Sequence, residues 1–468
     1  MDLEEEKSLT KKRIYLNAFD MNCTGHQSPG LWTHPEDRSH TYKTSEYWIE
    51  LAKLLERGGF DAIFLADVLG TYDVYKGSRD AAVRQGAQSP VNDPSLVVPL
   101  MSAVTKHLGF GVTASTTHEH PYTFARRMST LDHLTNGRVG WNIVTSYLKS
   151  AAVNIGMEDQ VKHDERYDIA AEYLEVCYKL WEGSWEEDAI VLDKANGIYA
   201  DPDKVHDINH EGKYYKVPGA HLTEPSPQRT PVLYQAGASK KGLEFAGQNA
   251  ECVFIGAPTI KAAKRSVEKL REQAELAGRS RDEVKVLTML TPIVGKTEKE
   301  AWAKYEDYKK HISHEGALAL FGGWTGIDLS GYAPDQELEY IENDSIQSAL
   351  ENFTKIDSDK KWTVDDIKEF VGIGGMSAYT VGSAEQVADT LEQWVEEAGV
   401  DGFNIAYAIT PGTFEDFIEL VVPILRERGL VRTEYEGSSL RDSLFGKGDR
   451  LPAHHHGKKF SLEKAEVV

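Results

Sequence analysis

The side chains with the clearest chemical potential follow short apolar runs in this sequence. In chain order they are Cys23, His26, Asp67, Tyr72, Thr113, Asn142, Ser146, Tyr147 and Ser239. Hydroxyl and amide groups dominate this set. Hydroxyls beside backbone N–H groups at the start of a helix, as expected at Ser239, suit the phosphate of a ligand. The set therefore indicates a site for a cofactor that supplies its own chemistry.

The composition narrows the classes of protein to consider. The chain has 468 residues, and 52 Lys and Arg against 74 Asp and Glu give a formal net charge of −22 at pH 7. Such an acidic surface repels phosphate backbones, so we expect no nucleic-acid partner. Three cysteines without CxxC spacing and a charged N-terminus without an apolar signal segment favour a cytoplasmic location. No apolar run approaches the ~20 residues of a membrane span, so we expect no membrane partner.

Eight apolar runs alternate with amphipathic stretches along most of the chain. They are residues 14–19, 61–67, 108–115, 139–146, 231–237, 251–256, 285–295 and 402–408. Continuous apolar runs are typical of strands that are buried on both faces of a parallel sheet. A doubly wound sheet would show the same alternation, but eight such units favour a closed α/β fold, the (β/α)8 TIM barrel. The active site of that fold lies at the carboxyl ends of the strands, where the side chains named above fall.

The stretches between the runs carry helix signals. Residues 45–57 place Trp48, Leu51, Ala52 and Leu55 on one face and precede two glycines, so they predict a helix. Capping-type spacing predicts further helix starts at Thr297, Ser383 and Thr413, and Pro423 predicts a kink in the last helix.

We expect one TIM-barrel domain over residues 1–468. Two polar, turn-rich segments interrupt the alternation at about residues 183–230 and 311–377, and we interpret them as insertions in βα loops, the second closing over the pocket. Residues 436–468, with three consecutive histidines, are expected to form a C-terminal extension on the surface. The His-Glu-His run at 118–120 lacks a further ligand set, so we predict a solvent-exposed loop there and no metal site.

Longer motifs resemble one protein family, in the same order along the chain. They are FLAD (64–67), LDHLTNGR (131–138), GWNIVTS (140–146), HDERYD (163–168) and YQAGAS (234–239). These motifs look like those of the bacterial-luciferase-like, flavin-dependent monooxygenases. The most similar branch contains nitrilotriacetate, dibenzothiophene-sulfone and long-chain alkane monooxygenases. NAFDMNCTGH (17–26) and EYLEVCYKLWEGSW (172–185) are especially similar to the alkane enzyme.

The resemblance implies roles for particular residues. Family positions that contact FMN correspond here to Asp67, Thr113, Ser146, His163, Tyr167 and Ser239, of which Ser146, Tyr167 and Ser239 would hold the phosphate. Positions that line the catalytic pocket of the alkane enzyme correspond to Cys23, His26 and Tyr72. That enzyme has histidines where this chain has Tyr147 and, in a less secure alignment, Leu320. Alkane hydroxylation therefore does not follow from the resemblance.

The resemblance also implies a reaction. Family members bind FMN that a separate NAD(P)H-dependent flavin reductase has reduced, add O2 at flavin C4a, and use the resulting (hydro)peroxide. We therefore expect a two-component, FMNH2- and O2-dependent monooxygenase of a small organic substrate in a catabolic pathway. His26, with a reference pKa near ~6.5, could protonate the peroxide, while Tyr72 and Tyr147 could orient it or bind substrate. Family members usually self-associate, which implies a homodimer or homotetramer.

Several alternatives stay open. Long-chain alkane hydroxylation, oxidation of an organosulfur compound or aminopolycarboxylate, and riboflavin-lyase type N-dealkylation of a flavin-like heterocycle compete as reactions. A noncatalytic flavin-binding barrel and a deazaflavin-dependent hydride-transfer enzyme compete as classes. Individual residues also have structural interpretations: Cys23 as a packed small residue, His26 as a structural hydrogen-bonding group and Asp67 as a loop cap.

Overall fold

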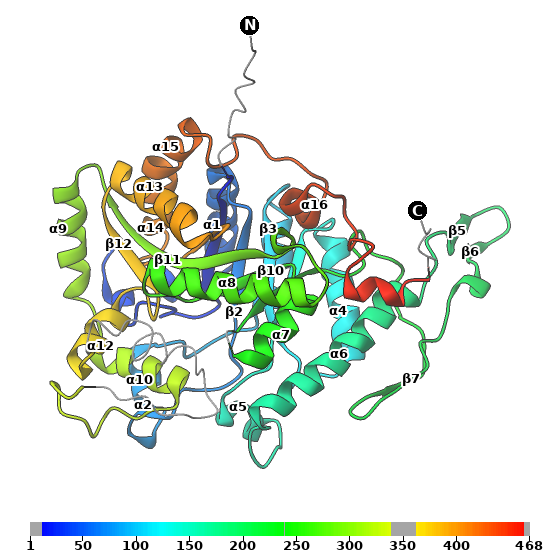
Figure 1. Cartoon of the computed structure of the whole chain (residues 1–468), viewed down its shortest axis with the longest axis horizontal. Helices are drawn as coiled ribbons and strands as arrows, with labels where there is room; N and C mark the ends of the chain where they lie inside the picture. Colours follow the sequence, from blue (N-terminus) through cyan, green and yellow to red (C-terminus); the bar gives the residue numbers. More distant parts are fainter. Residues whose placement is uncertain (1–11, 238, 338–361, 463–468) are drawn as a thin grey trace, which may run out of the picture.

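The computed structural model describes residues 12–237, 239–337 and 362–462, and a ring of parallel strands forms its centre (Figure 1). The strands of the ring are β1 (Tyr15–Met21), β2 (Ala62–Ala66), β3 (Gly109–Ser115), β4 (Val139–Val144), β9 (Val232–Ala236), β10 (Cys252–Ile255), β11 (Lys285–Gly295) and β13 (Gly402–Ile405). β1 pairs with β2 and β13, and β10 pairs with β9 and β11, so the ring is closed. These strands coincide with the eight predicted runs, and the TIM-barrel prediction is confirmed.

Helices cover the outside of the barrel (Figure 1). They are α1 (Ser45–Gly58), α3 (Val98–Ser102), α4 (Pro121–Leu134), α6 (His163–Gly183), α7 (Lys240–Asn249), α8 (Ile260–Leu276), α9 (Glu298–Lys309) and α13 (Ala384–Gln393). In α1 the Thr44 side chain accepts a hydrogen bond from the first turn, Gly59 ends the helix at a φ of 79°, and Trp48, Leu51 and Leu55 are buried. The helix predicted for residues 45–57 is therefore confirmed, with the buried face that its apolar spacing indicated.

Two of the three predicted helix caps are confirmed. Thr297 and Ser383 accept hydrogen bonds from the first turns of α9 and α13. The third is wrong, because Thr413 lies inside α14 (Gly412–Asp416), where its hydroxyl accepts hydrogen bonds from the backbone of the loop after β13. A π-helical turn, Phe417–Val421, directly precedes α15 (Val422–Glu427), and Pro423 lies in the first turn of α15, where its missing N–H is tolerated. The kink predicted at Pro423 stays a prediction.

One further parallel strand was not predicted. β12 (Ala378–Ser383) pairs with Leu290–Gly295, the half of β11 that extends beyond the ring. Its sequence, AYTVGS, is short and follows several glycines, so it gives little periodic signal.

The predicted insertions contain their own elements. Residues 183–230 include two hairpins, β5 (Ile190–Asp193) with β6 (Ile198–Ala200) and β7 (His210–Glu211) with β8 (Lys216–Val217). Residues 311–377 include α10 (His314–Thr325) and α12 (Val364–Gly372), which lie near α2 (Asp80–Gln85) and α5 (Lys149–Asn154) at one end of the barrel (Figure 1). Residues 338–361 of that insertion, Ala238 and both chain ends lie outside the described residues.

The C-terminal segment closes the opposite end of the barrel. In α16 (Leu440–Phe445), Leu440 and Leu444 join the apolar cluster that includes Phe64 and Tyr234 in the barrel interior. Arg441 is 1% exposed and donates to both carboxylate oxygens of Glu251, at 2.7 and 2.9 Å. Burial alone would raise the pKa of Glu251, but the Arg441 guanidinium holds it below its usual value.

The expectation that this segment only extends over the surface is therefore wrong for these residues. Even His455, within the triple histidine, is 3% exposed, and its Nε2 lies 3.0 Å from the backbone oxygen of Asn249. The physical reason is that the amino ends of the strands would otherwise expose apolar barrel-interior side chains to water.

We predict that Arg441→Ala lowers the free energy of unfolding by roughly 3–5 kcal/mol, because it leaves the Glu251 carboxylate buried without its partner. Urea unfolding followed by tryptophan fluorescence measures this change. Arg450→Ala is the matched control: Arg450 pairs with the exposed Glu187 at 2.7 Å, and its loss should cost about 0–1 kcal/mol. Equal losses in the two variants would contradict a special contribution of the buried pair.

Candidate active site

A cavity of about 980 Å³ opens at the carboxyl ends of β2, β3, β4, β9 and β10. This volume is near the top of the ~300–1,000 Å³ range of ligand pockets, which leaves room for a cofactor beside a small molecule. The lining includes seven residues that the sequence assigned to a site: Asp67, Thr113, Ser146, Tyr147, His163, Tyr167 and Ser239. All six predicted FMN contacts therefore reach one cavity, although they are spread over most of the chain.

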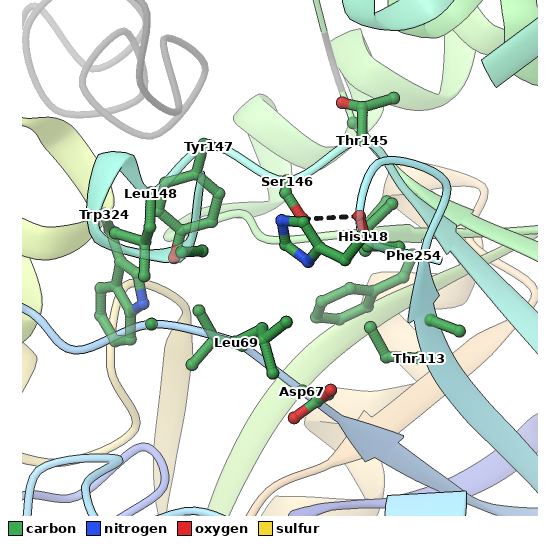
Figure 2. Close-up of a pocket in the computed structure, with 18 of the residues that line it drawn as sticks. Asp67, Leu69, Thr113, His118, Thr145, Ser146, Tyr147, Leu148, Phe254 and Trp324 are labelled. Atoms are coloured by element: carbon green, nitrogen blue, oxygen red, sulfur yellow. Dashed lines mark hydrogen bonds between the residues drawn. The ribbon is translucent and has the colours of Figure 1, made fainter. Parts of the chain in front are cut away.

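Three hydroxyls and a guanidinium gather at one end of this cavity, beside the start of α7. Ser146, Arg166, Tyr167 and Ser239 all line this end. The Ser146 hydroxyl donates to Ser115 Oγ at 2.8 Å (Figure 2), and Arg166, which is 2% exposed, donates from Nη1 to the Ser146 carbonyl oxygen. Positive charge, hydroxyl donors and the N-terminus of a helix together suit a dianion such as a phosphate.

Local sequence explains this arrangement. Ser239 caps α7 by accepting a hydrogen bond from the backbone N–H of Gly242 at 3.1 Å. A Cβ at Gly242 would lie 2.7 Å from the Tyr167 hydroxyl, so glycine there lets Tyr167 reach the cap. Ser146 has a φ of 57°, a left-handed conformation that turns the chain sharply after β4. Such outliers are common at ligand sites.

Asp67 and Thr113 lie in the middle of the cavity, at the ends of β2 and β3 (Figure 2). Burial, and then the charge of Asp93, raises the pKa of Asp67 to about 7. The Thr113 hydroxyl accepts a hydrogen bond from Asn142 Nδ2 at 2.9 Å, so its own proton can point to a ligand. Near neutral pH, the Asp67 carboxyl and the Thr113 hydroxyl can therefore donate hydrogen bonds to, or accept them from, the polar edge of a ligand ring.

The other end of the cavity is largely apolar. Leu69, Leu148 and Trp324 surround the Tyr147 side chain there (Figure 2). Burial raises the pKa of Tyr147 to about 12, so its hydroxyl stays protonated at neutral pH. This end suits an uncharged organic group.

Cys23, His26 and Tyr72 do not line the cavity, in contrast to the sequence-based expectation. Each lies behind a lining residue: Cys23 bridges Val91, His26 packs against Phe19 with ring centroids 4.5 Å apart, and the Tyr72 hydroxyl lies 3.2 Å from that of Tyr147. They therefore form the layer of side chains behind the site.

The buried environment also corrects the chemistry expected of two of them. Burial lowers the pKa of His26 to about 3, so the ring is neutral at physiological pH and cannot act as an imidazolium acid. Burial and the nearby Asp20 and Asp67 carboxylates raise the pKa of the Cys23 thiol well above its usual value. For Cys23, the interpretation as a packed small residue fits better, whereas both ring nitrogens of His26 are buried without a hydrogen-bond partner among the described residues, so the structure does not support a structural hydrogen-bonding role either.

Among the lining residues that sequence reasoning did not assign to a site, three stand next to assigned ones or could contact a ligand: Arg166, Trp324 and His118. Arg166 lies inside the HDERYD motif, but only its neighbours were assigned a role. Trp324 lines the cavity one helical turn beyond Leu320, which is 0% exposed in an apolar cluster and does not reach the cavity. His118 also lines it, with a buried Nε2 that has no hydrogen-bond partner among the described residues.

His118 corrects the prediction of a solvent-exposed loop at 118–120. Thr117 donates a hydrogen bond to the Thr145 carbonyl oxygen at 3.0 Å, which holds this loop against the end of β4 and turns His118 toward Ser146 (Figure 2). Burial lowers the pKa of His118 below its usual value. Its position three residues after β3 was the available signal, because residues beyond barrel strands face the site.

Two negative observations apply to the described part of the chain. Within residues 12–237, 239–337 and 362–462, no three His, Cys, Asp or Glu side chains are grouped so that they could hold a metal ion. Among the same residues, no helix is both long enough and apolar enough to cross a membrane.

A closed barrel whose cavity has one anion-binding end and one apolar end defines a class of enzymes that hold a phosphorylated cofactor beside a small organic molecule. Residues 22–402 match the family described as luciferase-like monooxygenase, and the chain belongs to this family.

Known relatives agree with this assignment. The chain is 54% identical over 451 residues to the dimethyl-sulfide monooxygenase of Hyphomicrobium sulfonivorans, which covers 96% of this chain and 94% of that protein. It is 53% identical over 450 residues to the long-chain alkane monooxygenase of Geobacillus thermodenitrificans, with 96% and 98% covered. A crystal structure of riboflavin lyase with modified FMN and riboflavin matches with a TM-score of 0.90 at 38% identity, with 97% and 100% covered. The predicted family and enzyme class, a flavin-dependent monooxygenase, are confirmed.

We predict a pH-dependent stability effect at Asp67. Its pKa rises from 3.8 to about 7 on folding, so the folded chain binds more protons than the unfolded chain in this range, and stability falls as pH rises through it. Asp67→Asn removes this penalty. The unfolding free energy of the variant, relative to wild type, should therefore rise between pH 5 and 7 by up to about 1.4 kcal/mol per pH unit.

Urea unfolding of the ligand-free chain at several pH values measures this difference. Asp193→Asn provides the control, because hydrogen bonds from Asn196 and from the backbone of Ala195 lower the pKa of that carboxyl, so no titration is expected between pH 5 and 8. A flat difference for both variants would show that the Asp67 carboxyl ionises normally.

Proposed function

We propose that this chain is the oxygenase of a two-component system, which uses FMNH2 from a separate NAD(P)H-dependent flavin reductase and O2 to oxidise a small organic substrate. The observation that carries the proposal is the group formed by Ser146, Arg166, Tyr167 and Ser239 at the start of α7. It offers a phosphate-sized anion a buried positive charge, several hydroxyls and a helix N-terminus within one cavity.

FMN has a charged phosphate and a flat, mostly apolar ring system. The residues that line the cavity fit both parts. Ser146, Tyr167, Ser239 and Arg166 would hold the phosphate, with His163 beside them at the start of α6. Asp67 and Thr113 would face the polar edge of the ring system. When bound, reduced flavin supplies the electrons that activate O2 for insertion into the substrate. The protein's share is to bind, orient and exclude water.

A separate reductase is consistent with the sequence, in which no GxGxxG fingerprint follows a strand and opens a helix. The reductase, the homodimer or homotetramer, and a role in catabolism stay predictions. Cytoplasmic location is likewise a prediction, made from the cysteine usage and the charged N-terminal segment.

For the substrate, we propose a small neutral organosulfur compound such as a dialkyl sulfide. Leu69, Leu148 and Trp324 give the substrate end of the cavity an apolar surface, which suits an uncharged group. A carboxylate would be disfavoured there, because it would lose its hydrating water without gaining hydrogen bonds from these side chains. The 54% identical relative is named for dimethyl sulfide, which has this chemistry. A second candidate is oxidative cleavage of a flavin-like heterocycle, because the Tyr147 and Trp324 rings could stack on a planar substrate.

The proposed phosphate site predicts discrimination between FMN and riboflavin. Arg166→Ala and Ser239→Ala should each weaken reduced FMN binding roughly tenfold or more, since a hydrogen bond to a charged group contributes about 1.5–3 kcal/mol. Riboflavin, which has the same ring without the phosphate, should lose little affinity in either variant. Anaerobic titrations measure both ligands. Equal losses for both, or no affinity of the wild type for reduced FMN, would refute the site.

Turnover provides the direct test of the reaction. The reaction mixture contains the chain, a flavin reductase, NADH, FMN and O2. Dimethyl sulfide, hexadecane and riboflavin are each tested in a separate reaction, and products are followed by mass spectrometry. We expect oxidation of the sulfide only when FMN and O2 are both present. Riboflavin cleavage would instead support the second candidate, and hexadecane hydroxylation the alkane alternative. Absence of any oxygen-dependent product would favour a noncatalytic or deazaflavin-dependent barrel.

A further inference from the structure

Hydrogen bonds behind the apolar end of the cavity form a branched chain, which we call the Gln88 chain: Tyr147, Tyr72, Trp324 and Gln88. The Tyr147 and Tyr72 hydroxyls lie 3.2 Å apart, and the Tyr72 hydroxyl lies 2.8 Å from Gln88 Oε1. Trp324 donates from Nε1 to the Tyr72 hydroxyl at 3.1 Å. Gln88 donates from Nε2 to the backbone oxygen of His26 at 2.6 Å.

These contacts determine where each proton of the chain points. A carbonyl oxygen can only accept, so the amide of Gln88 must direct its Nε2 toward His26 and its Oε1 toward Tyr72. Gln88 Oε1 then accepts the one proton of the Tyr72 hydroxyl. Trp324 can only donate, and it occupies one of the two acceptor positions on the Tyr72 oxygen. The remaining acceptor position faces Tyr147, which must donate its proton there.

The Tyr147 oxygen can therefore only accept a hydrogen bond from a ligand, because its own proton is donated to Tyr72. Its side chain lines the cavity next to Trp324 and Leu148 (Figure 2), and Tyr72 is its one hydrogen-bond partner among the described residues. Because burial keeps the pKa of Tyr147 near 12, the hydroxyl does not alter this pattern by ionising at neutral pH.

We propose that the Gln88 chain makes Tyr147 an obligate hydrogen-bond acceptor, which selects substrates that present a donor or an alkyl group there and rejects those that present a sulfonyl or carboxylate oxygen. This inference rests on the proposed function and specifies its substrate class. Tyr147 is the specificity-determining residue, and Gln88 and Tyr72 are positioning residues that act through it. Trp324 lines the cavity itself and also donates to the Tyr72 oxygen.

Packing prevents the chain from reversing its direction. Tyr72 is 2% exposed and Gln88 is 4% exposed, so neither can turn to water for a different partner. A Cβ at Gly323 of α10 would overlap the Tyr72 ring, which shows how closely this helix holds the ring in place. Reversal would point the amide oxygen of Gln88 at the backbone oxygen of His26, so that two acceptors would face each other without a proton between them.

Two substitutions should reverse the polarity by different routes. Gln88→Leu removes the acceptor of the Tyr72 proton, so Tyr72 can donate to Tyr147 and release the Tyr147 proton to the cavity. Tyr72→Phe removes the acceptor of the Tyr147 proton directly, with the same result. Neither residue lines the cavity, so the space available to a ligand should be preserved.

The test compares two probes of similar size, dimethyl sulfone, whose oxygens are strong acceptors, and dimethyl sulfide, a weak acceptor. Ligand-observed NMR measures both dissociation constants without oxygen, for the flavin-free chain and for the chain with reduced FMN. We expect the affinity for the sulfone, relative to the sulfide, to rise about five- to tenfold in Gln88→Leu and in Tyr72→Phe.

Tyr147→Phe provides the matched background. The Gln88→Leu effect on the probe ratio should vanish when Tyr147 is absent, because no proton remains to be redirected. A purely structural effect of Gln88 would persist in that background and would overturn the proposal. So would an unchanged ratio in both folded single variants, with folding checked by thermal midpoint; if one variant fails to fold, the other decides.

The same titration separates this inference from the proposed function. A chain that does not bind reduced FMN refutes the function, while the ratio in the flavin-free chain still tests the Gln88 chain. A chain that binds flavin but shows no shift in ratio refutes only the hydrogen-bond polarity.

Discussion

Closure of the strand ring is the constraint on which the site depends. Because β10 pairs with both β9 and β11, and β1 with both β2 and β13, all eight carboxyl ends surround one space. Asp67, Thr113, Ser146 and Ser239 lie at or just beyond the carboxyl ends of four different strands and meet there only because the ring is closed. The opposite end is closed by α16. Arg441 of this helix pairs with Glu251, which precedes β10, and the pair holds the C-terminal segment against the barrel.

Burial, more than residue type, decides what the titratable groups around this space can do. The same loss of hydration raises the pKa of Asp67 to about 7, lowers that of His26 to about 3 and raises that of Cys23. The imidazole and the thiol, which look reactive in the sequence, become neutral packing groups. The carboxyl group becomes able to change its protonation near neutral pH. Desolvation favours the uncharged form in each case.

The two ends of the cavity have different proposed roles. Charge and hydroxyls at the start of α7 would anchor a cofactor, whereas the apolar end would receive the substrate. The Gln88 chain joins this second end to the layer of side chains behind it, so that buried residues influence a ligand they do not touch. Relatives in this family are named for different compounds, among them dimethyl sulfide and long-chain alkanes, and the proposed division would let the substrate end differ without a change at the proposed phosphate site.

Much of this protein followed from the sequence. Apolar runs predicted the eight strands, and strand-end position together with the family resemblance named six residues that the structure brings to one cavity, because both signals are local. Tertiary structure alone placed Cys23, His26 and Tyr72 behind the cavity wall, turned His118 and Trp324 toward the cavity, and packed Leu440 and Leu444 against the barrel interior. Whether a side chain faces a cavity or another side chain depends on segments hundreds of residues away, as when Trp324 meets Tyr72. Local periodicity carries no information about such contacts, so neither burial nor the proton direction in the Gln88 chain could be read from it.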